Sequence, residues 1–367
     1  MLELLIFMIV AYIPICVLCI VSPLMSKRSI CFGVAIPEEH MGGELIESIK
    51  KSYKSWGVVI SIISLLPIVA FQPWRVESRV ELAISTVLFS IIVLQIVLYF
   101  AFYKKVKRIK GEQGWQIQLA NTGRVMIDTS FHKAKKVYSN HWFFLHLLVV
   151  LLTAVYLIYI YDEIPNVMAT HYDLQGNADG FSNKSVMTVF DLSFMQLFMI
   201  GLFIGCNWLT AISKQQVDPK NPERSLANNI KFRRLCSLFM IVLGFIIVVF
   251  FSMLKVGSVR EVSSSFTGAS STLFLAVLVI VSTYFIIAMV RLKRMPFVEE
   301  TTVLPMDADQ YWKLGMLYYN PADPALFVEK RFGIGYTVNI GRPMSWLVIL
   351  APFVIIGIII FLTSGGN

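Results

Sequence analysis

Eight apolar stretches of about twenty residues each constrain the fold of this chain more than any other feature. A helix rises about 1.5 Å per residue, so about 20 apolar residues cross the roughly 30 Å of hydrocarbon in a membrane. Aromatic residues stand at many of the ends, where amphipathic rings suit the headgroup layer. We therefore predict an all-α polytopic membrane protein with about eight transmembrane helices, at residues 2–25, 56–74, 82–103, 142–161, 186–212, 232–254, 271–290 and 345–363.

The composition agrees with a membrane location. Hydrophobic residues make up 56% of the chain and charged residues 15%, whereas soluble domains have about 45–50% and about 25%. This balance excludes a soluble enzyme, a disordered protein and a disulfide-stabilised scaffold. The formal charge of +9 is shared by nucleic-acid-binding proteins and by membrane proteins with basic cytoplasmic loops, so the placement of the charges has to decide between them.

The placement of Lys and Arg predicts the orientation of the helices. Of the 32 basic residues, 27 fall in four alternate loops, at residues 26–55, 104–141, 213–234 and 291–344, and 5 fall in the other three loops. Cytoplasmic loops carry the excess of Lys and Arg in membrane proteins. We therefore expect these four loops in the cytoplasm, both termini outside, and a multi-pass protein of the plasma membrane.

Five segments follow from these spans, and Pro14, Pro23, Pro67 and Pro352 within or near spans predict kinks. The segments are an N-terminal three-helix membrane region with basic cytoplasmic loops at 1–141, a helix–loop–helix unit at 142–212, two further membrane helices at 213–290, a cytoplasmic hairpin-containing domain with small α+β elements at 291–344, and the last membrane helix at 345–367.

The external loop at residues 162–186 is the most distinctive polar segment. In an extended strand, His171 and Asp173 point to one face, because the period of a strand is two. A glycine-rich turn would return Asp179 and Lys184 to that face. An imidazole beside carboxylates binds a divalent ion or acts as an acid and base. The alternative is structural, with these charges capping the next helix and Lys184 paired with either aspartate.

This loop carries a resemblance to a known family. The residues that carry it are, in order, Pro165, His171-x-Asp173, Gly176, Gly180 and Asn183-Lys184. The segment resembles an uncharacterised domain of multi-pass bacterial membrane proteins, a family that includes the SdpI-type immunity proteins. These proteins protect a producer cell from its own secreted peptide toxin. The resemblance therefore implies a bacterial membrane protein that acts on an extracellular peptide.

A second resemblance lies at residues 309–339, which are similar to a short domain of unknown function that accompanies the first. The turn cluster at 320–324 separates two aromatic and β-branched runs and predicts a small β-hairpin. The runs beginning Phe32-Gly33 and Phe332-Gly333 are either two strands of one small sheet or a chance similarity. Our candidates for packing or for contact with a cytoplasmic regulator are Phe32, Gly33, Trp312, Asn320, Asp323, Phe332 and Gly333.

Two further features bear on the partners. The basic clusters at residues 104–110 and 133–136 predict contact with anionic lipid headgroups. We do not expect nucleic acid as a partner, because no reading module accompanies the charges. Asp191 is the ionisable residue that we identify within a span, and it either faces the membrane interface or belongs to a site beneath the external loop.

These observations favour a non-enzymatic immunity or sensing protein for an extracellular peptide, with no cofactor. The contact candidates are His171, Asp173, Asp179, Lys184 and Asp191. One alternative is a membrane enzyme with a metal held by the external loop. Another is a transporter of a small solute through the helix bundle.

Overall fold

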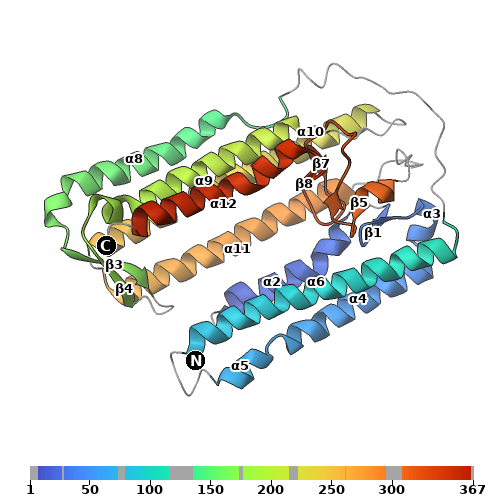
Figure 1. Cartoon of the computed structure of the whole chain (residues 1–367), viewed down its shortest axis with the longest axis horizontal. Coiled ribbons are helices and arrows are strands. Elements are labelled where there is room, and N and C mark those ends of the chain that lie inside the picture. Colours follow the sequence, from blue (N-terminus) through green and yellow to red (C-terminus); the bar gives the residue numbers. More distant parts are fainter. Residues whose placement is uncertain are drawn as a thin grey trace. The chain divides into compact units, whose positions relative to one another are not determined.

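The computed structural model describes residues 7–26, 29–72, 79–115, 135–172, 177–214, 222–260, 262–294 and 308–364. Helices dominate it, and its strands pair into two-stranded antiparallel sheets (Figure 1). The chain divides into two compact units. Unit 1 comprises Met1–Ala134, Ser213–Phe232 and Ile286–Arg342, and unit 2 comprises Lys135–Ile212, Arg233–Phe285 and Pro343–Asn367.

Within the described residues, six helical stretches are long and apolar enough to cross a membrane. They are Glu44–Phe71, Val80–Glu112, Asn140–Tyr159, Val186–Ile212, Glu223–Val259 and Ser264–Leu292. Two shorter apolar helices, Ile13–Met25 and Pro343–Ile358, lie at the first and last predicted spans. The predicted helical membrane fold is confirmed, while the count of eight crossings and the outward termini stay predictions.

The helices of unit 1 are interrupted where the sequence has proline. Pro14, Pro23 and Pro67 each lie in the first turn of a new helical segment, where the missing N–H costs little. The helical segments are a π-helical turn at Met8–Tyr12, α2 at Ile13–Val21, a 3-10 turn at Ser22–Met25, α3 at Glu38–Met41, α4 at Glu44–Ile63, α5 at Leu66–Phe71 and α6 at Val80–Glu112.

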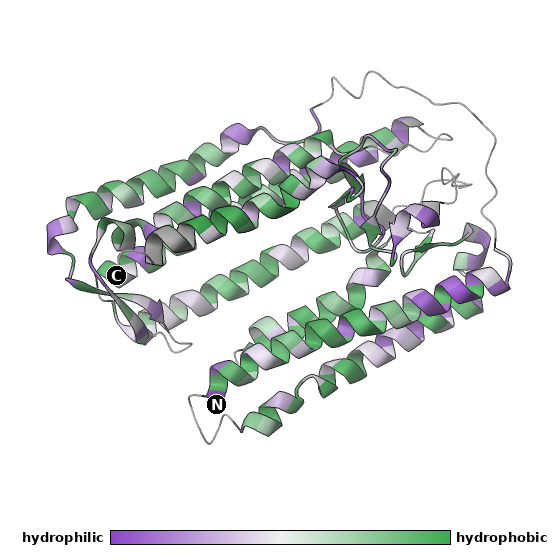
Figure 2. Ribbon diagram, viewed as in Figure 1, coloured by the Kyte–Doolittle hydropathy of each residue, from purple (hydrophilic) through white to green (hydrophobic). Residues whose placement is uncertain are grey.

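Close contacts fix α2, α4 and α6 against one another. A Cβ on Gly57 of α4 would lie 2.8 Å from a side-chain atom of Ile20, so only glycine lets α2 approach here. Gln95 of α6 donates from Nε2 to the Gly57 carbonyl oxygen at 3.0 Å. Such small-residue contacts and interhelical hydrogen bonds are the usual means of helix association in lipid. Figure 2 shows that α4 and α6 are mainly apolar along their length and polar at the end that lies near the short strands.

Three short hairpins lie at the polar ends of α4 and α6, and we call them the three-hairpin lobe. They pair β1 (Ile30–Cys31) with β2 (Val34–Ala35), β5 (Trp312–Lys313) with β6 (Leu317–Tyr318), and β7 (Phe327–Glu329) with β8 (Tyr336–Val338). The predicted turn at 320–324 joins β6 to β7, and the hairpins lie on either side of it. Phe32-Gly33 and Phe332-Gly333 lie in connections between paired strands, so the hypothesis that they are strands of one sheet is wrong.

Unit 2 is built around the buried face of one helix, α9. The residues on this face recur at alternating spacings of four and three, as helix packing requires. They are Val189, Ser193, Gln196, Ile200, Phe203, Asn207 and Thr210. The elements of the unit are a 3-10 turn at Asn140–Phe143, α8 at Phe144–Tyr159, β3 at Val167–Tyr172, β4 at Ala178–Asn183, α9 at Val186–Ile212, the greater parts of α10 at Pro222–Val259 and α11 at Ser264–Arg294, and α12 at Pro343–Ser364, with Pro352 inside it.

Candidate functional site

The β3–β4 hairpin follows α8 and is fixed to unit 2 by one face. Met168 is 1% exposed. The side chains in its cluster are Leu157, Ile160, Ile164, Val189 and Val259. Side chains alternate between the faces of a strand, so Val167 lies on the opposite face, as does Phe181, which pairs with Ala169. Val167 and Phe181 are 54% and 61% exposed, so the hairpin presents an apolar face away from that cluster.

A β-bulge brings His171 and Asp179 together. The strand register shifts on both sides of His171, which pairs with Gly180. The Nδ1 atom of His171 lies 2.5 Å from Oδ1 of Asp179, and the side chains are 66% and 42% exposed. The pair offers an imidazole and a carboxylate to a ligand in solvent. Asp173, predicted to share this face, lies outside the described residues.

Lys184 belongs to the base of the hairpin. Its Nζ donates to the carbonyl oxygen of Ile164 at 3.1 Å and lies 4.6 Å from the centre of the Tyr161 ring. A cation over an aromatic face is electrostatically favourable. The structure therefore does not bring Lys184 to the pair formed by His171 and Asp179. The contacts of Lys184 with Ile164 and Tyr161 instead stabilise the base of the hairpin.

An ion pair between a buried lysine and a partly exposed aspartate joins α9 to α10 in unit 2. The Oδ1 atom of Asp191 lies 2.7 Å from Nζ of Lys255, and the Lys255 side chain is 4% exposed. The same Nζ donates to the carbonyl oxygen of Thr188. A charge removed from water needs such partners, because the desolvation cost is large. Asp191 is thus engaged by a cation within the bundle.

The same end of α10 also holds the hairpin. Ser258, one turn beyond the buried lysine, donates from Oγ to the carbonyl oxygen of Ala169 in β3. Farther on, Arg260 places Nη1 3.1 Å from an Oε2 of Glu163, just before the hairpin. One stretch of helix therefore contacts the ion pair, β3 and the segment leading into β3. The ion pair and the polar contacts to the hairpin therefore lie along the same end of α10.

Interhelical hydrogen bonds continue along α9. Gln196 donates from Nε2 to the Val248 carbonyl oxygen at 2.7 Å and to Oγ of Ser252 at 2.8 Å. Asn207 donates from Nδ2 to Oδ1 of Asn140 at 2.7 Å. In lipid, such bonds satisfy polar side chains that water does not reach. Both α9 residues therefore tie this helix to its neighbours.

The structure adds three ionisable side chains to the one found by sequence analysis. Besides Asp191, unit 2 buries Lys255, His146 and Arg233. His146 is 1% exposed, with Nε2 3.0 Å from a carbonyl oxygen of α10. Arg233 is fully buried and donates to a carbonyl oxygen near the end of α9. The helix α10 extends beyond the predicted span at both ends, which is why Lys255 was assigned to a loop.

The metal-enzyme alternative needs at least three ligands. In the part of the chain that the structure describes, no group of three or more His, Cys, Asp or Glu side chains is placed to hold a metal ion. His171 and Asp179 supply two such groups. The five cysteines are free thiols. The described residues therefore offer two ligands at the hairpin and no third.

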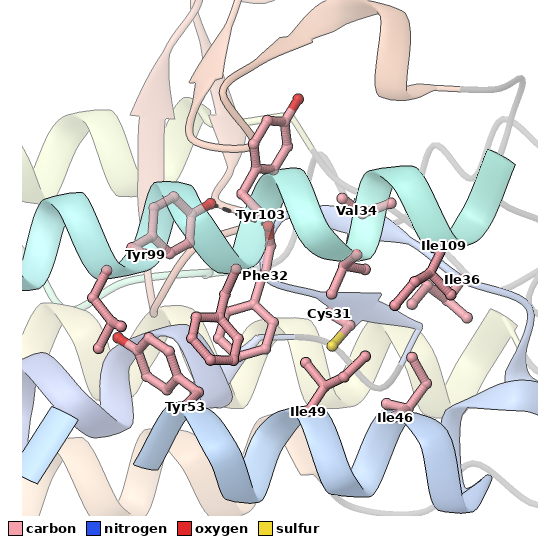
Figure 3. Close-up of a cluster of buried hydrophobic side chains, with 13 residues drawn as sticks. Cys31, Phe32, Val34, Ile36, Ile46, Ile49, Tyr53, Tyr99, Tyr103 and Ile109 are labelled. Atoms are coloured by element: carbon pink, nitrogen blue, oxygen red, sulfur yellow. Dashed lines mark hydrogen bonds between the residues drawn. The ribbon is translucent and has the colours of Figure 1, made fainter. Parts of the chain in front are cut away.

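The residues that the sequence indicated as candidates for packing or for contact with a cytoplasmic regulator lie in unit 1. Phe32 is 1% exposed and packs edge-on against Tyr53 at 4.8 Å between ring centres. Figure 3 shows Tyr53 and Tyr99 on either side of the Phe32 ring. The Tyr99 hydroxyl lies 3.3 Å from the carbonyl oxygens of Phe32 and Leu314, so it reaches the tips of two hairpins. Phe332 stacks edge-on against Tyr99 at 4.7 Å, which places both predicted phenylalanines around one helix.

Asp309 holds the lobe together, although sequence analysis assigned it no role. Its Oδ1 accepts the Ala35 backbone N–H at 3.2 Å and a bond from Arg331, and its Oδ2 accepts Nζ of Lys110 at 2.6 Å. Arg331 also donates to the Gly33 carbonyl oxygen at 3.1 Å. Burial raises the pKa of Asp309, but Arg331 and Lys110 outweigh it and hold the pKa below its usual value.

The turn cluster after β6 is a second polar centre. The Oδ2 atom of Asp323 accepts Nζ of Lys214 at 2.7 Å and the Tyr318 hydroxyl at 2.9 Å. Burial raises the pKa of Tyr318 to about 12. Burial also opposes ionisation of Asp323, yet Lys214 and the other donors hold its pKa below the usual value. Oδ1 of Asn320 accepts the Ala322 N–H at 3.0 Å, as expected for a turn.

The remaining two sequence candidates also have structural surroundings. Trp312 is 7% exposed and packs against Tyr318 at 5.2 Å between ring centres. The guanidinium of Arg331 lies 5.3 Å from the centre of the Trp312 ring. Gly333 has a φ of +70° in the connection between β7 and β8. Asn339 was missed, although it is fully buried and its Nδ2 lies within 3.2 Å of three carbonyl oxygens of the turn cluster.

Comparison with known proteins adds two short matches. Residues 148–197 match a "Domain of unknown function (DUF1648)", and this range contains the whole β3–β4 hairpin. Residues 321–346 match a "Family of unknown function (DUF5808)", from the turn after β6 through the β7–β8 hairpin. No curated protein and no solved structure matches the chain. The chain is a multi-pass membrane protein that is similar to these two families over those segments.

Proposed function

We propose that this protein is a non-enzymatic immunity or sensing factor that recognises an extracellular peptide at the β3–β4 hairpin. The observation that carries the proposal is a rigidly anchored hairpin with an exposed apolar face. Met168, Ala169 and the end of α10 fix it to the bundle, while Val167 and Phe181 face outward. Exposed apolar surface on an anchored element is a candidate interaction surface.

The hairpin suits a peptide for two reasons. Within the residues that the structure describes, each strand of this sheet has a strand partner on one edge only, and an extended peptide can add to the other edge through its backbone. The exposed pair of His171 and Asp179 lies on the same hairpin and would supply polar recognition beside the apolar face. A peptide captured here would be held at the membrane before it assembled a pore.

The three-hairpin lobe would carry the second half of this function. Charge placement favours the cytoplasm for the lobe, where it would be available to a regulator. In an immunity protein, capture at the hairpin alone suffices. In a sensor, occupancy of the hairpin would also change the contacts of the lobe.

The test is protection of a host that secreted pore-forming peptides kill. Cells that express the wild type should survive a peptide that the hairpin recognises, and Phe181→Asp or the double variant His171→Ala, Asp179→Ala should abolish protection. Phe181→Leu is the matched control, because it keeps an apolar side chain at the same place. Each variant is checked for expression and thermal stability in detergent. Equal survival with wild type and Phe181→Asp would reject the proposed site.

A further inference from the structure

In unit 1, two antiparallel helices change from apolar to basic sequence at the same level. Tyr53 of α4 packs edge-on against Phe102 of α6 at 5.2 Å between ring centres. Just beyond this contact, the apolar run of α6 ends at Tyr103. The basic side chains exposed on the two helices at or past this level are Lys51, Lys54, Lys104, Lys105, Lys107 and Arg108. Such a boundary marks the edge of the hydrocarbon layer.

The tip of the β5–β6 hairpin lies at this boundary. A Cβ on Gly315 would lie 2.7 Å from the hydroxyl oxygen of Tyr99 and 3.0 Å from Cδ2 of Tyr103. The Tyr99 hydroxyl also reaches the carbonyl oxygen of Leu314 at 3.3 Å. The contacts place the tip beside the last apolar turn of α6, where Gly33 and Phe332 also meet Tyr99.

One face of this hairpin is apolar and exposed. Trp312 and Tyr318 pair across the strands and are buried, so the side chains next to them along the strands, Lys313, Leu317 and Tyr319, point the other way. The outward residues are Lys313, Leu314, Leu317 and Tyr319, and the last three are 44–45% exposed. An apolar surface with a tyrosine and lysines at its rim is typical of elements that lie in the membrane interface.

We propose that the β5–β6 hairpin rests in the headgroup layer of an anionic membrane leaflet, with Leu314 and Leu317 against the acyl chains. Two observations select lipid as the occupant. The first is the level of the tip, which the contacts with Tyr99 and Tyr103 fix at the end of the apolar part of α6. The second is charge, because the exposed lysines of both helices surround this level and attract anionic headgroups.

The contact with lipid headgroups gives the lobe a role in membrane binding, in addition to its internal packing. The lobe follows the surface of the leaflet, so the content of anionic lipid sets how firmly the β5–β6 hairpin is held. Charge placement identifies this leaflet as the cytoplasmic one. The inference stands independently of peptide recognition at the β3–β4 hairpin, which lies in the other unit.

Photocrosslinking of the full chain in nanodiscs tests the proposal. A benzophenone amino acid replaces Leu317 in one sample and Gln113 in another, in phosphatidylcholine with and without phosphatidylglycerol. Gln113 is the control, because it is exposed directly after the end of α6, about 15 Å beyond Tyr103 along the helix axis. We expect lipid adducts at least severalfold more abundant at Leu317 than at Gln113, and a further increase when phosphatidylglycerol is present.

Three results would overturn the inference. Equal lipid adducts at the two positions would show that the hairpin does not lie in the interface. Equal yields in both lipid mixtures would remove the role of anionic headgroups. Crosslinks from Leu317 to a second copy of the chain, in place of lipid, would identify the exposed face as a protein interface. A thermal melting temperature equal to that of the wild type checks that each labelled protein is folded.

Discussion

At the scale of single residues, the buried charges of this protein are held by specific partners. Asp309 accepts bonds from Lys110 and Arg331, and Asp191 accepts one from Lys255. Removing a charge from water is costly, and removing one partner from a buried pair leaves the other uncompensated. Each of these residues therefore has a large effect on the free energy of unfolding, whereas exposed ion pairs contribute little.

Asp309→Asn should loosen the three-hairpin lobe. The change keeps an acceptor for the Ala35 N–H but removes the negative charge that Lys110 and Arg331, 14% and 8% exposed, both contact. We expect a loss of about 3 kcal/mol in the stability of the lobe, measured by limited proteolysis in a denaturant series. The control is Arg108→Gln, which removes an exposed pair with Glu112 and should cost less than about 0.5 kcal/mol.

The same carboxylate predicts a pH dependence. The pKa of Asp309 is lower in the folded lobe than in the unfolded chain, so its ionised form stabilises the lobe at neutral pH. This contribution should be lost as the pH falls through the folded pKa, below about 4. Proteolysis of the wild type should therefore accelerate in that range more than proteolysis of Asp309→Asn. Parallel pH profiles would contradict this assignment.

The residues that sequence analysis missed share a physical reason. His146 lies within an apolar run of the sequence, but a single histidine does not indicate that its side chain meets a carbonyl oxygen of another helix. Lys255 lies directly after the predicted end of its span, so the apolar pattern places it in a loop. The spacing of three between Ser252, Lys255 and Ser258 was the available signal, because it places them on one helical face. The pairing of His171 with Asp179 has a different origin. It depends on the β-bulge, where the strand register shifts on both sides of His171.

At the scale of elements, the tips of two hairpins meet through glycine. Phe32 and Gly33 both have positive φ, of 46° and 79°, as in the tight turns that suit a hairpin. A Cβ on Gly33 would lie 2.5 Å from the carbonyl oxygen of Gly315 and 2.7 Å from the Tyr99 hydroxyl. The first and second hairpins of the lobe therefore approach as closely as backbone allows.

Gly33→Ala should separate these tips, and Gly333→Ala is its matched control. Both glycines have positive φ, so both changes add backbone strain of about 1–2 kcal/mol. A Cβ on Gly333 has nothing within 4 Å, whereas one on Gly33 meets the opposing backbone. The difference in unfolding free energy between the two variants measures the tip contact. We expect Gly33→Ala to be the less stable, and equal losses would refute close packing of the tips.

The elements differed in how well their sequence predicted them. Long apolar runs predicted helices at all eight positions, because lipid permits little else to an isolated apolar segment. The strands of the lobe have two or three residues each, too few for an alternating pattern to show. Sequence analysis therefore placed one hairpin around residues 320–324, where the structure has a connection between two hairpins.

At the scale of the whole molecule, charge placement predicts which side each loop occupies. The three-hairpin lobe draws its strands from two basic loops, at residues 26–55 and 291–344. The β3–β4 hairpin comes from a loop with a single basic residue, Lys184. The positive-inside rule therefore assigns the two sets of hairpins to opposite sides of the membrane, which is what recognition outside and regulation inside require.

Reporter insertions test this assignment. Alkaline phosphatase, which is active only outside the cytoplasm, should be active when inserted after Tyr172 and inactive when inserted after Gln113. A fluorescent protein that folds only in the cytoplasm should give the opposite result at each position. Activity of the phosphatase at Gln113 would invert the topology and with it the sides assigned to both sets of hairpins.

The long-range bonds of Tyr99 and Arg331 also affect how the protein folds during synthesis. Tyr99 and Leu314 are 215 positions apart, and Gly33 and Arg331 are 298 apart. The ribosome synthesises the first hairpin long before the segments that cover it. The glycine tip of this hairpin therefore stays uncovered during most of translation. A message truncated before residue 309 would yield a membrane-inserted fragment with that tip uncovered, and quality-control proteases would remove it.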